Sequence, residues 1–413
     1  MPAVKREGLR MTHVVVVGAG QAGCALVARL RADGFQGQVT LIGAEPHPPY
    51  QRPPLSKDYL LGELERERLY LRPEAFYAEH EIDLRLGSEV AAIDTGRQVV
   101  ILETGAEVPY DELVLTTGSS PRRLPAAIGG DLQGVLTMRD IRDADALAPS
   151  LVEGKRVLVV GGGYIGLEAA AVCAKRGLKV TLIEMAPRIL QRVAAPETSD
   201  YFRRLHLEQG VDIREGVGLE RLIGEDGRVV AAKLSTGEEL PFDLVLVGVG
   251  IVPNTKLAES AGIEVENGIR TDELGRTSAP NVWAAGDCAS LPHGEGRIRL
   301  ESVGNAIDQA ETVARNIMGA EAPYVPQPWF WSDQYDTKLQ IAGLNTGYDR
   351  VFVRQIGEAL SHWYYRGERL VAVDAMNDSR AYMIGKRLIE AGKSPKPEVV
   401  TDPATDLKAL LKA

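Results

Sequence analysis

The sequence has few of the side chains that form disulfides or bind metals through sulfur. Its 413 residues include only Cys24, Cys173 and Cys288, which lie far apart and form no C-x-x-C pair. This spacing argues against a redox dithiol and against a zinc site. Unpaired cysteines are typical of a reducing compartment. We therefore expect a cytoplasmic protein with no bound metal.

Long apolar runs and an excess of basic residues are also missing. The run Val14 to Val17 is too short for the core of a signal peptide, and no segment has the length of a membrane span. The formal net charge is −10, whereas a nucleic-acid-binding protein needs a basic surface. We expect neither a membrane protein nor a nucleic-acid-binding protein. We interpret the first ten residues as a short basic extension and Met11 as a candidate start.

The chain contains three pairs of similar segments in the same order. Residues 14–23 (VVVVGAGQAG) resemble residues 157–166 (VLVVGGGYIG), residues 82–87 (IDLRLG) resemble residues 211–216 (VDIREG), and residues 104–111 (TGAEVPYD) resemble residues 236–243 (TGEELPFD). Each member of the third pair runs into an apolar segment and then a glycine. Two similar α/β units explain this pattern most simply. Within each, the order of elements predicts a doubly wound parallel sheet with an inserted antiparallel excursion.

The last ninety residues have a different pattern. Residues 351–355, 359–365 and 369–375 alternate like strands, with a turn at Arg366-Gly-Glu, and residues 381–391 have the pattern of a helix. We expect a third, α+β domain here.

The first glycine motif has the spacing G-x-G-x-x-G directly after a strand. Its members are Gly18, Gly20 and Gly23. A helix starting near Gln21 would direct its backbone N–H groups at a pyrophosphate. The next predicted strand, residues 38–42, ends near Glu45, where a carboxylate can bind a ribose. The alternative is a glycine-rich turn without a ligand.

The second motif has the same G-x-G-x-x-G spacing after a strand, with Gly161, Gly163 and Gly166. The strand that follows, residues 179–183, ends in Glu184, whose carboxylate would bind both ribose hydroxyls and repel a 2′-phosphate, so the site favours NAD. Arg188 and Arg192 follow closely, and an arginine can accommodate that phosphate, which leaves NADP as the alternative.

A third motif indicates that one of the two nucleotides is FAD. Residues 281–287 (NVWAAGD) form an apolar strand that ends in Gly286 and Asp287. Asp287 can supply the acidic group near the pyrophosphate and ribityl end of FAD, and Gly286 permits close approach. Since this motif belongs to the first site but follows the second unit, the second unit is predicted to be inserted in the first.

The chain resembles the FAD-dependent ferredoxin reductases, a group that includes putidaredoxin reductase, rubredoxin reductase and the reductases of aromatic dioxygenases and is related to apoptosis-inducing factor. Four segments carry this resemblance: residues 52–58 (RPPLSKD), 161–168 (GGGYIGLE), 299–305 (RLESVGN) and 329–335 (WFWSDQY). It covers nearly the whole chain after Met11. The resemblance implies a glutathione-reductase-like fold with an FAD-binding domain (1–118 and 248–322), an NAD-binding domain (119–247) and a C-terminal α+β domain (323–413).

The resemblance also implies roles for individual residues. Arg52 and Lys57 would lie along the flavin, Glu168 would pair with Lys57 and face the nicotinamide, and Trp331 would lie where the redox partner docks. The alternatives are ordinary surface charges for Lys57 and Glu168 and simple packing for Trp331. Further positions carried over from the motifs are Thr117, Gly118 and Val303 for FAD, and Tyr164, Ile165, Arg192 and Gly250 for NAD.

The resemblance implies that the protein passes electrons from NADH through FAD to a two-iron two-sulfur ferredoxin, or to rubredoxin, which supplies a haem monooxygenase or a ring-hydroxylating dioxygenase. The related disulfide reductases need a dithiol beside the flavin, and residues 52–57 contain no cysteine. The rival functions are an NADH oxidase and a redox sensor like apoptosis-inducing factor. A monomer and a homodimer are both compatible with the sequence.

Overall fold

The computed structural model describes residues 12–412, which divide into two compact units. The first consists of the chain up to Gln51, Glu67–Ser120 and Val252–Pro326, and the second of Arg52–Arg66, Pro121–Ile251 and the chain from Gln327 onward. The candidate start at Met11 lies outside the described residues.

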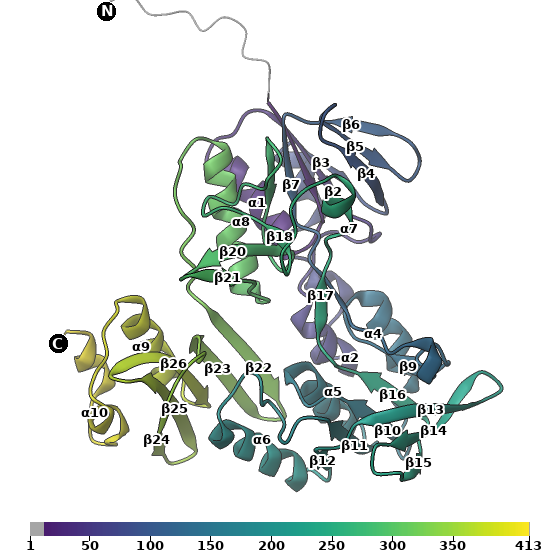
Figure 1. Ribbon diagram of the computed structural model, residues 1–413, viewed down its shortest axis with the longest axis vertical. Coiled ribbons are helices and arrows are strands. Elements are labelled where there is room, and N and C mark those ends of the chain that lie inside the picture. Colours follow the sequence, from purple (N-terminus) through teal and green to yellow (C-terminus); the bar gives the residue numbers. More distant parts are fainter. Residues whose placement is uncertain (1–11, 413) are drawn as a thin grey trace, which may run out of the picture. The chain divides into compact units, whose positions relative to one another are not determined.

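The first unit is built on a parallel sheet in the order β19-β7-β1-β2-β3. Four successive valines in β1 are buried, as expected for a strand covered on both faces. Helices α1 (Gln21–Ala32) and α8 (Val303–Ile317) lie side by side (Figure 1), and an Arg29–Glu311 ion pair of 2.7 Å joins them. The strands are β1 (His13–Val17), β2 (Gln38–Ile42), β3 (Ile82–Arg85), β7 (Glu112–Leu115) and β19 (Val282–Ala284).

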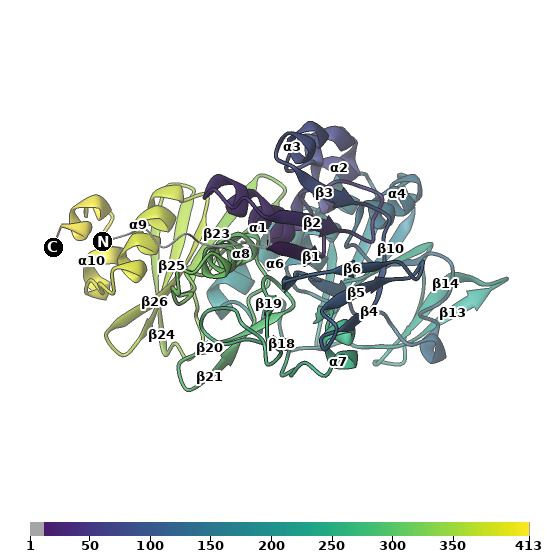
Figure 2. The same ribbon diagram turned by 90° about the horizontal axis from the view of Figure 1, so that it is seen from above.

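An antiparallel sheet of three strands, β4-β5-β6, belongs to the same unit and appears in Figure 2 as three neighbouring strands. Its members are β4 (Val90–Asp94), β5 (Val99–Leu102) and β6 (Glu107–Pro109). The unit also contains α3 (Glu74–Glu79), α7 (Lys256–Ser260), β18 (Ile269–Arg270), β20 (Ala289–His293) and β21 (Gly296–Ile298).

The second unit contains the same combination of sheets. Its parallel sheet has the order β12-β11-β10-β16-β9, and an antiparallel sheet β13-β14-β15 accompanies it. The members are β9 (Val135–Leu136), β10 (Arg156–Val160), β11 (Lys179–Glu184), β12 (Asp212–Glu215), β13 (Leu219–Glu225), β14 (Arg228–Leu234), β15 (Glu239–Pro241) and β16 (Leu244–Val247). The helices are α2 (Asp58–Leu61), α4 (Ile141–Leu147), α5 (Tyr164–Lys175) and α6 (Pro196–Glu208).

The C-terminal part of the second unit is an antiparallel sheet in the order β22-β23-β26-β25-β24, with α9 packed against it. Its elements are β22 (Trp329–Gln334), β23 (Thr337–Gly343), β24 (Arg350–Ile356), β25 (Ala359–Arg366), β26 (Arg369–Met376), α9 (Ser379–Glu390) and α10 (Pro397–Thr401). Two further short strands, β8 (Ser119–Pro121) and β17 (Ile251–Pro253), lie where the chain passes between units.

The predicted fold class is confirmed. Each glycine motif directly follows a strand of a parallel sheet, β1 or β10, and each parallel sheet is accompanied by a three-stranded antiparallel sheet. The strands predicted at residues 38–42, 351–355, 359–365 and 369–375, and the helix at 381–391, are present with shifts of two residues or fewer. The structure adds β22, which the sequence patterns did not indicate as a strand.

Candidate cofactor and catalytic site

The first glycine loop joins β1 to α1, and its three glycines have different surroundings. A Cβ atom added at Gly18 would lie 2.2 Å from the Thr116 carbonyl oxygen, and one at Gly23 would lie 2.1 Å from the Gly18 carbonyl oxygen. A Cβ at Gly20 would have no atom of the described structure within 4 Å beyond its chain neighbours and its own helix. Two glycines therefore permit close backbone packing, and Gly20 faces open space.

The second loop, between β10 and α5, has the same arrangement of two closely packed glycines and one glycine that faces open space. A Cβ at Gly161 would lie 2.4 Å from the Gly248 carbonyl oxygen, and one at Gly166 would lie 2.0 Å from the Gly161 carbonyl oxygen. Gly163, like Gly20, has open space around its Cβ position in the part of the chain that the structure describes. Space beside the second glycine is what a pyrophosphate needs to approach the backbone.

Helices α1 and α5 begin at these loops without a capping side chain. Their N-cap residues are Gly20 and Gly163, neither of which can offer a side-chain acceptor, whereas Ser302 at the start of α8 accepts a hydrogen bond from the Asn305 N–H. The first N–H groups of a helix need acceptors and carry partial positive charge. Both helix starts thus fit the diphosphate group of a dinucleotide.

The predicted ribose ligand of the second site, Glu184, is held firmly at the end of β11. Its two carboxylate oxygens accept hydrogen bonds of 2.7 Å from the N–H groups of Gly162 and Ala186. Gly250, which follows β16, has a φ of +95°, and a Cβ there would lie 3.8 Å from Arg192 Nη2. The structure therefore brings Glu184 next to the glycine loop, and Arg192 next to Gly250.

Two residues near this loop have apolar side chains that face solvent. Ile165, in the first turn of α5, is 47% exposed, and Met185, directly after Glu184, is 79% exposed. Ile165 was predicted from its place in the glycine motif. The sequence analysis did not select Met185, and its position after the acidic residue was the available signal.

The other predicted FAD residues lie at the carboxyl ends of strands in the first unit or near them. The Ser119 hydroxyl donates to Asp287 Oδ2 over 2.8 Å, and the Thr117 hydroxyl donates to the Asn254 carbonyl over 2.7 Å. A Cβ at Gly286 would lie 3.1 Å from Ala22 Cβ on α1. Asp287 is thereby placed near the start of α1. The remaining predicted residues are Gly118 directly after Thr117, Val303 at the first position of α8, and Glu45, which accepts a hydrogen bond of 2.5 Å from Tyr50.

The second unit contains Lys57 and Glu168 as an ion pair. Lys57 Nζ lies 3.2 Å from Glu168 Oε1, and the two side chains are 13% and 4% exposed. Lys57 Nζ also lies 3.5 Å from Asp333 Oδ2. Arg52, in the same segment as Lys57, donates a 2.9 Å hydrogen bond to the Arg139 carbonyl. The alternative of two ordinary surface charges is therefore wrong for Lys57 and Glu168.

Two hydroxyl groups complete the surroundings of Glu168. Ser56 donates to Glu168 Oε2 over 3.0 Å, and Ser332 donates to Glu168 Oε1 over 2.7 Å. Burial raises the pKa of the Glu168 carboxyl group, and the Lys57 ammonium group and the hydroxyl donors act in the opposite direction. The sequence analysis missed both serines, although each lies next to a selected residue, Lys57 or Trp331.

Trp331 lies on the edge strand β22, half-buried and stacked on Trp329 with 5.4 Å between ring centroids. Phe330, on the opposite side of the strand, packs against Tyr164 with 5.0 Å between ring centroids. Tyr164 is the first residue of α5, so β22 contacts the helix that follows the second glycine loop. Trp331 therefore adjoins the strand residues that contact Lys57 and Glu168.

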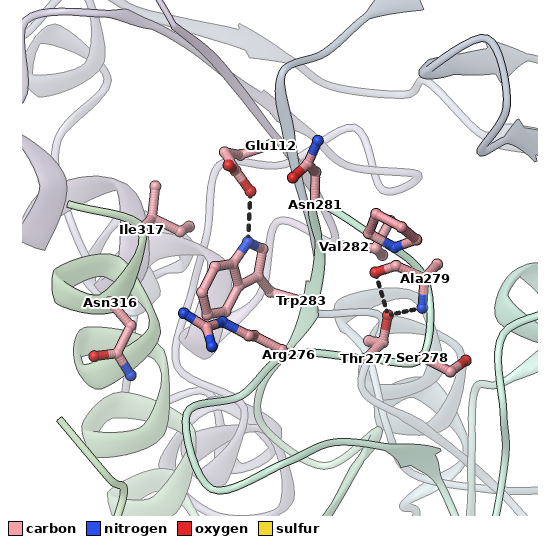
Figure 3. Close-up of a pocket in the computed structure, with 11 residues that line it drawn as sticks. Glu112, Arg276, Thr277, Ser278, Ala279, Asn281, Val282, Trp283, Asn316 and Ile317 are labelled. Carbon is pink, nitrogen blue, oxygen red and sulfur yellow. Dashed lines mark hydrogen bonds between the residues drawn. The ribbon is translucent and has the colours of Figure 1, made fainter. Parts of the chain in front are cut away.

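A cavity of about 470 Å³ in the first unit lies away from these residues. Figure 3 shows Trp283 donating a 2.7 Å hydrogen bond to Glu112, with the Arg276 guanidinium 5.4 Å from the centroid of the Trp283 ring. Glu112 and Val282 are the first residues of their strands, at the edge of the sheet opposite the glycine loop. Because open α/β sheets bind ligands at the carboxyl ends of strands, we do not assign a cofactor to this cavity.

A family model described as "Pyridine nucleotide-disulphide oxidoreductase" matches residues 12–310, and a second, "Reductase C-terminal", matches residues 329–411. The chain belongs to the pyridine nucleotide-disulphide oxidoreductase family. Members of this family use FAD and NAD(P)H, the two cofactors predicted here. All three cysteines of this member are buried and free, and none lies in the segment from Arg52 to Lys57.

Similar proteins match nearly the full length of the chain. A ferredoxin–NAD(P)(+) reductase of Sphingomonas sp is 45% identical over 96% of this chain and 97% of its own, and putidaredoxin reductase of Pseudomonas putida is 41% identical over 97% of each. A crystal structure of the covalent putidaredoxin reductase–putidaredoxin complex matches with a TM-score of 0.93 and 40% identity, covering 97% of this chain and 98% of that one. The predicted resemblance is confirmed.

Residues 12–412 lack two other kinds of feature. The described helices include none that is long and apolar enough to cross a membrane. Within the same residues, no group of three or more histidine, cysteine, aspartate or glutamate side chains is arranged to hold a metal ion.

Asp374 is a buried acid away from the Lys57–Glu168 pair. It accepts hydrogen bonds from Thr198 (2.8 Å) and from Tyr364, and burial raises its pKa from 3.8 to about 6. The folded protein therefore holds a proton that the unfolded chain has released, and this contribution to stability is lost as the pH rises from about 4 to about 6. At about 1.4 kcal/mol per pKa unit the loss is roughly 3 kcal/mol.

We expect Asp374→Asn to gain stability relative to the wild type across this pH range. Urea unfolding of both proteins at several pH values would measure the difference. His362, whose pKa burial lowers to about 4, contributes with the opposite sign, so the comparison has to be made at each pH. A difference in stability that does not change with pH would contradict the prediction.

Proposed function

We propose that this protein is an NADH:ferredoxin oxidoreductase that delivers single electrons to a two-iron two-sulfur ferredoxin, which in turn supplies an oxygenase. FAD, when bound, takes up electrons in pairs from a nicotinamide and releases them one at a time. The chain itself binds the two dinucleotides, orients the nicotinamide and presents a docking surface. The similarity to putidaredoxin reductase over 97% of both chains, C-terminal sheet included, carries the proposal.

In this proposal FAD binds at the first glycine loop. Gly20 and the start of α1 hold the pyrophosphate, and Asp287 takes the ribityl end. Contributions from Gly18, Gly23, Glu45, Arg52, Thr117, Gly118 and Val303 complete the FAD site. The dinucleotide of the second unit is NAD, held by Gly161, Gly163, Tyr164, Ile165, Gly166, Glu184, Arg192 and Gly250. The domain limits at residues 118, 247 and 322 belong to the same proposal.

Lys57 and Glu168 are proposed to orient the nicotinamide and to balance charge as electrons arrive. Two desolvated, opposite charges attract more strongly than exposed ones because little water screens them. Their mutual contact and the hydroxyl donors to Glu168 support this role.

The test of the function compares electron acceptors. We expect NADH oxidation to be fast with a ferredoxin plus cytochrome c and slow in air alone. Rapid oxidation in air without ferredoxin would instead indicate an NADH oxidase. NADH reduction of the flavin with no turnover on any of a panel of ferredoxins would indicate a redox sensor.

Trp331→Ala should slow electron delivery to ferredoxin by about tenfold while the NADH half-reaction stays within about twofold of the wild type. The reason is its place on the edge strand β22, half-buried and available to a docking partner. Stopped-flow absorbance of the flavin separates the two half-reactions. Trp363→Phe, at a fully buried tryptophan of the same sheet, is the control. An effect of Trp331→Ala on hydride transfer alone would contradict the assignment.

Glu184→Ser should raise the ratio of kcat/KM for NADPH to that for NADH by about tenfold or more. The Glu184 carboxylate is fixed by two backbone N–H groups, so a 2′-phosphate beside it meets a negative charge that cannot move away. Steady-state kinetics with both donors measure the ratio. Glu208→Ser, at an exposed position at the end of α6, is the control. A wild type that already uses both donors equally would contradict the assignment.

A further inference from the structure

A continuous chain of hydrogen bonds, most of them buried, leads away from Glu168. Ser332 Oγ contacts Glu168 Oε1 (2.7 Å), and Gln334 Nε2 contacts Ser332 Oγ (3.1 Å). His206 Nε2 contacts Gln334 Oε1 (2.8 Å), and the Tyr335 hydroxyl contacts His206 Nδ1 (3.3 Å). Ser332, Gln334 and His206 are fully buried. The chain links helix α5 through strand β22 to helix α6.

The direction of every bond in this chain follows from chemistry. An ionised Glu168 only accepts, so Ser332 donates its single proton to it and accepts from the Gln334 amide N–H. The Gln334 carbonyl oxygen can then only accept, so His206 carries its proton on Nε2 and accepts from Tyr335 at Nδ1. Burial lowers the pKa of His206 to about 4, so the ring is neutral at physiological pH. All four donors thus point toward Glu168.

The groups that face Glu168 come from several elements. Lys57 and Ser56 approach from the segment before α2, and Lys57 also contacts Asp333. Tyr164 is on the same helix, one turn earlier, and burial raises its pKa. Among the described residues, Lys57 is the positively charged group in contact with Glu168. The hydroxyl groups and the chain of hydrogen bonds supply the remaining stabilisation of the carboxylate.

We infer that Gln334 and His206 are positioning residues that keep Glu168 ionised and directed at Lys57, and that they set the pH range in which hydride transfer is fast. This inference rests on the proposed role of Glu168 beside the nicotinamide. Donors to an ionised carboxylate favour its charged form. Without them Glu168 takes up a proton more readily, and its ion pair with Lys57 is lost as the pH falls.

The first measurement is the pH profile of flavin reduction by NADH in the holoenzyme. His206→Phe and Gln334→Met should be about threefold to tenfold slower than the wild type at acidic pH and within about twofold at alkaline pH. His206→Gln, which can keep a donor in place of Nε2, should restore the profile. His362→Phe is the matched control, because His362 is equally buried but bonds to Thr198. If His206→Phe does not fold, Gln334→Met tests the same link with little change in volume.

The second measurement detects the Glu168 proton directly. The infrared band of the protonated carboxyl group, identified by its loss in Glu168→Gln, should persist to higher pH in Gln334→Met than in the wild type, with no NADH present. Unchanged pH profiles and an unchanged infrared band in both His206→Phe and Gln334→Met would overturn the inference. An equal change in the control His362→Phe would also overturn it. If NADH reduces the flavin of Glu168→Gln at the wild-type rate, the proposed role of Glu168 beside the nicotinamide is wrong. The infrared band would still test whether the hydrogen-bond chain keeps Glu168 ionised.

Discussion

Gly20→Val is expected to give a folded protein that binds FAD at least about 100-fold more weakly than the wild type. Gly20 has extended backbone angles (φ −99°, ψ −159°), which valine also adopts, and its Cβ position is open. The added side chain would instead fill the space through which a pyrophosphate reaches the backbone of α1. Flavin absorbance per chain and titration with FAD measure the effect.

Two matched variants make this result specific. Gly18→Val places a Cβ 2.2 Å from a backbone oxygen at a φ of +118°, so we expect a loss of folded protein and not only of cofactor. Gly163→Val should keep FAD but lose rapid reduction by NADH, because Gly163 is the equivalent open position of the second loop. A Gly20→Val protein that retains one FAD per chain would contradict the assignment of the first site.

Lys57→Met is expected to slow flavin reduction by about 100-fold and to destabilise the fold by about 3 kcal/mol. The stability loss follows because Glu168 would remain in the protein interior as an unpaired charge. Glu168→Gln should cost less stability, since Lys57 is more exposed and keeps Asp333 as a partner. Stopped-flow flavin absorbance and urea unfolding measure the two quantities separately.

The double variant Lys57→Met/Glu168→Gln separates catalysis from structure. Removing both charges should restore most of the stability, because no unpaired buried charge remains. Flavin reduction should stay slow, since the groups that orient the nicotinamide are still missing. If the rate recovers together with the stability, the pair has a structural role only.

Much of the fold followed from local sequence patterns. A glycine that directly follows a run of buried aliphatic residues can belong to very few structures, and this chain has that pattern twice. The strands of the C-terminal sheet were also predictable where apolar residues at buried positions alternate with polar residues at exposed positions. The candidate site could be predicted only in part from the sequence, because Glu168 and Lys57 are far apart in sequence and their contact depends on tertiary packing.

Strand β22 shows why the rest could not be predicted. Its buried positions are the polar Ser332 and Gln334, whereas Trp329 and Trp331 are only half-buried. Sequence analysis assigns the inward face of a strand by its apolar residues, and here that assignment is reversed. The reversal has a physical cause, because the buried side chains hydrogen-bond to Glu168 and His206 on two helices. Only the contacts of those helices reveal it.

The positions of the tryptophans allow the unfolding of one unit to be followed by intrinsic fluorescence. Of its four tryptophans, Trp283 belongs to the first unit, and Trp329, Trp331 and Trp363 belong to the second. With those three replaced by phenylalanine, the emission spectrum would come from Trp283 alone. Its indole is 6% exposed and bonded to Glu112, so unfolding of the first unit should shift that emission to longer wavelength. The melting of the first unit can thus be followed by fluorescence without an added dye.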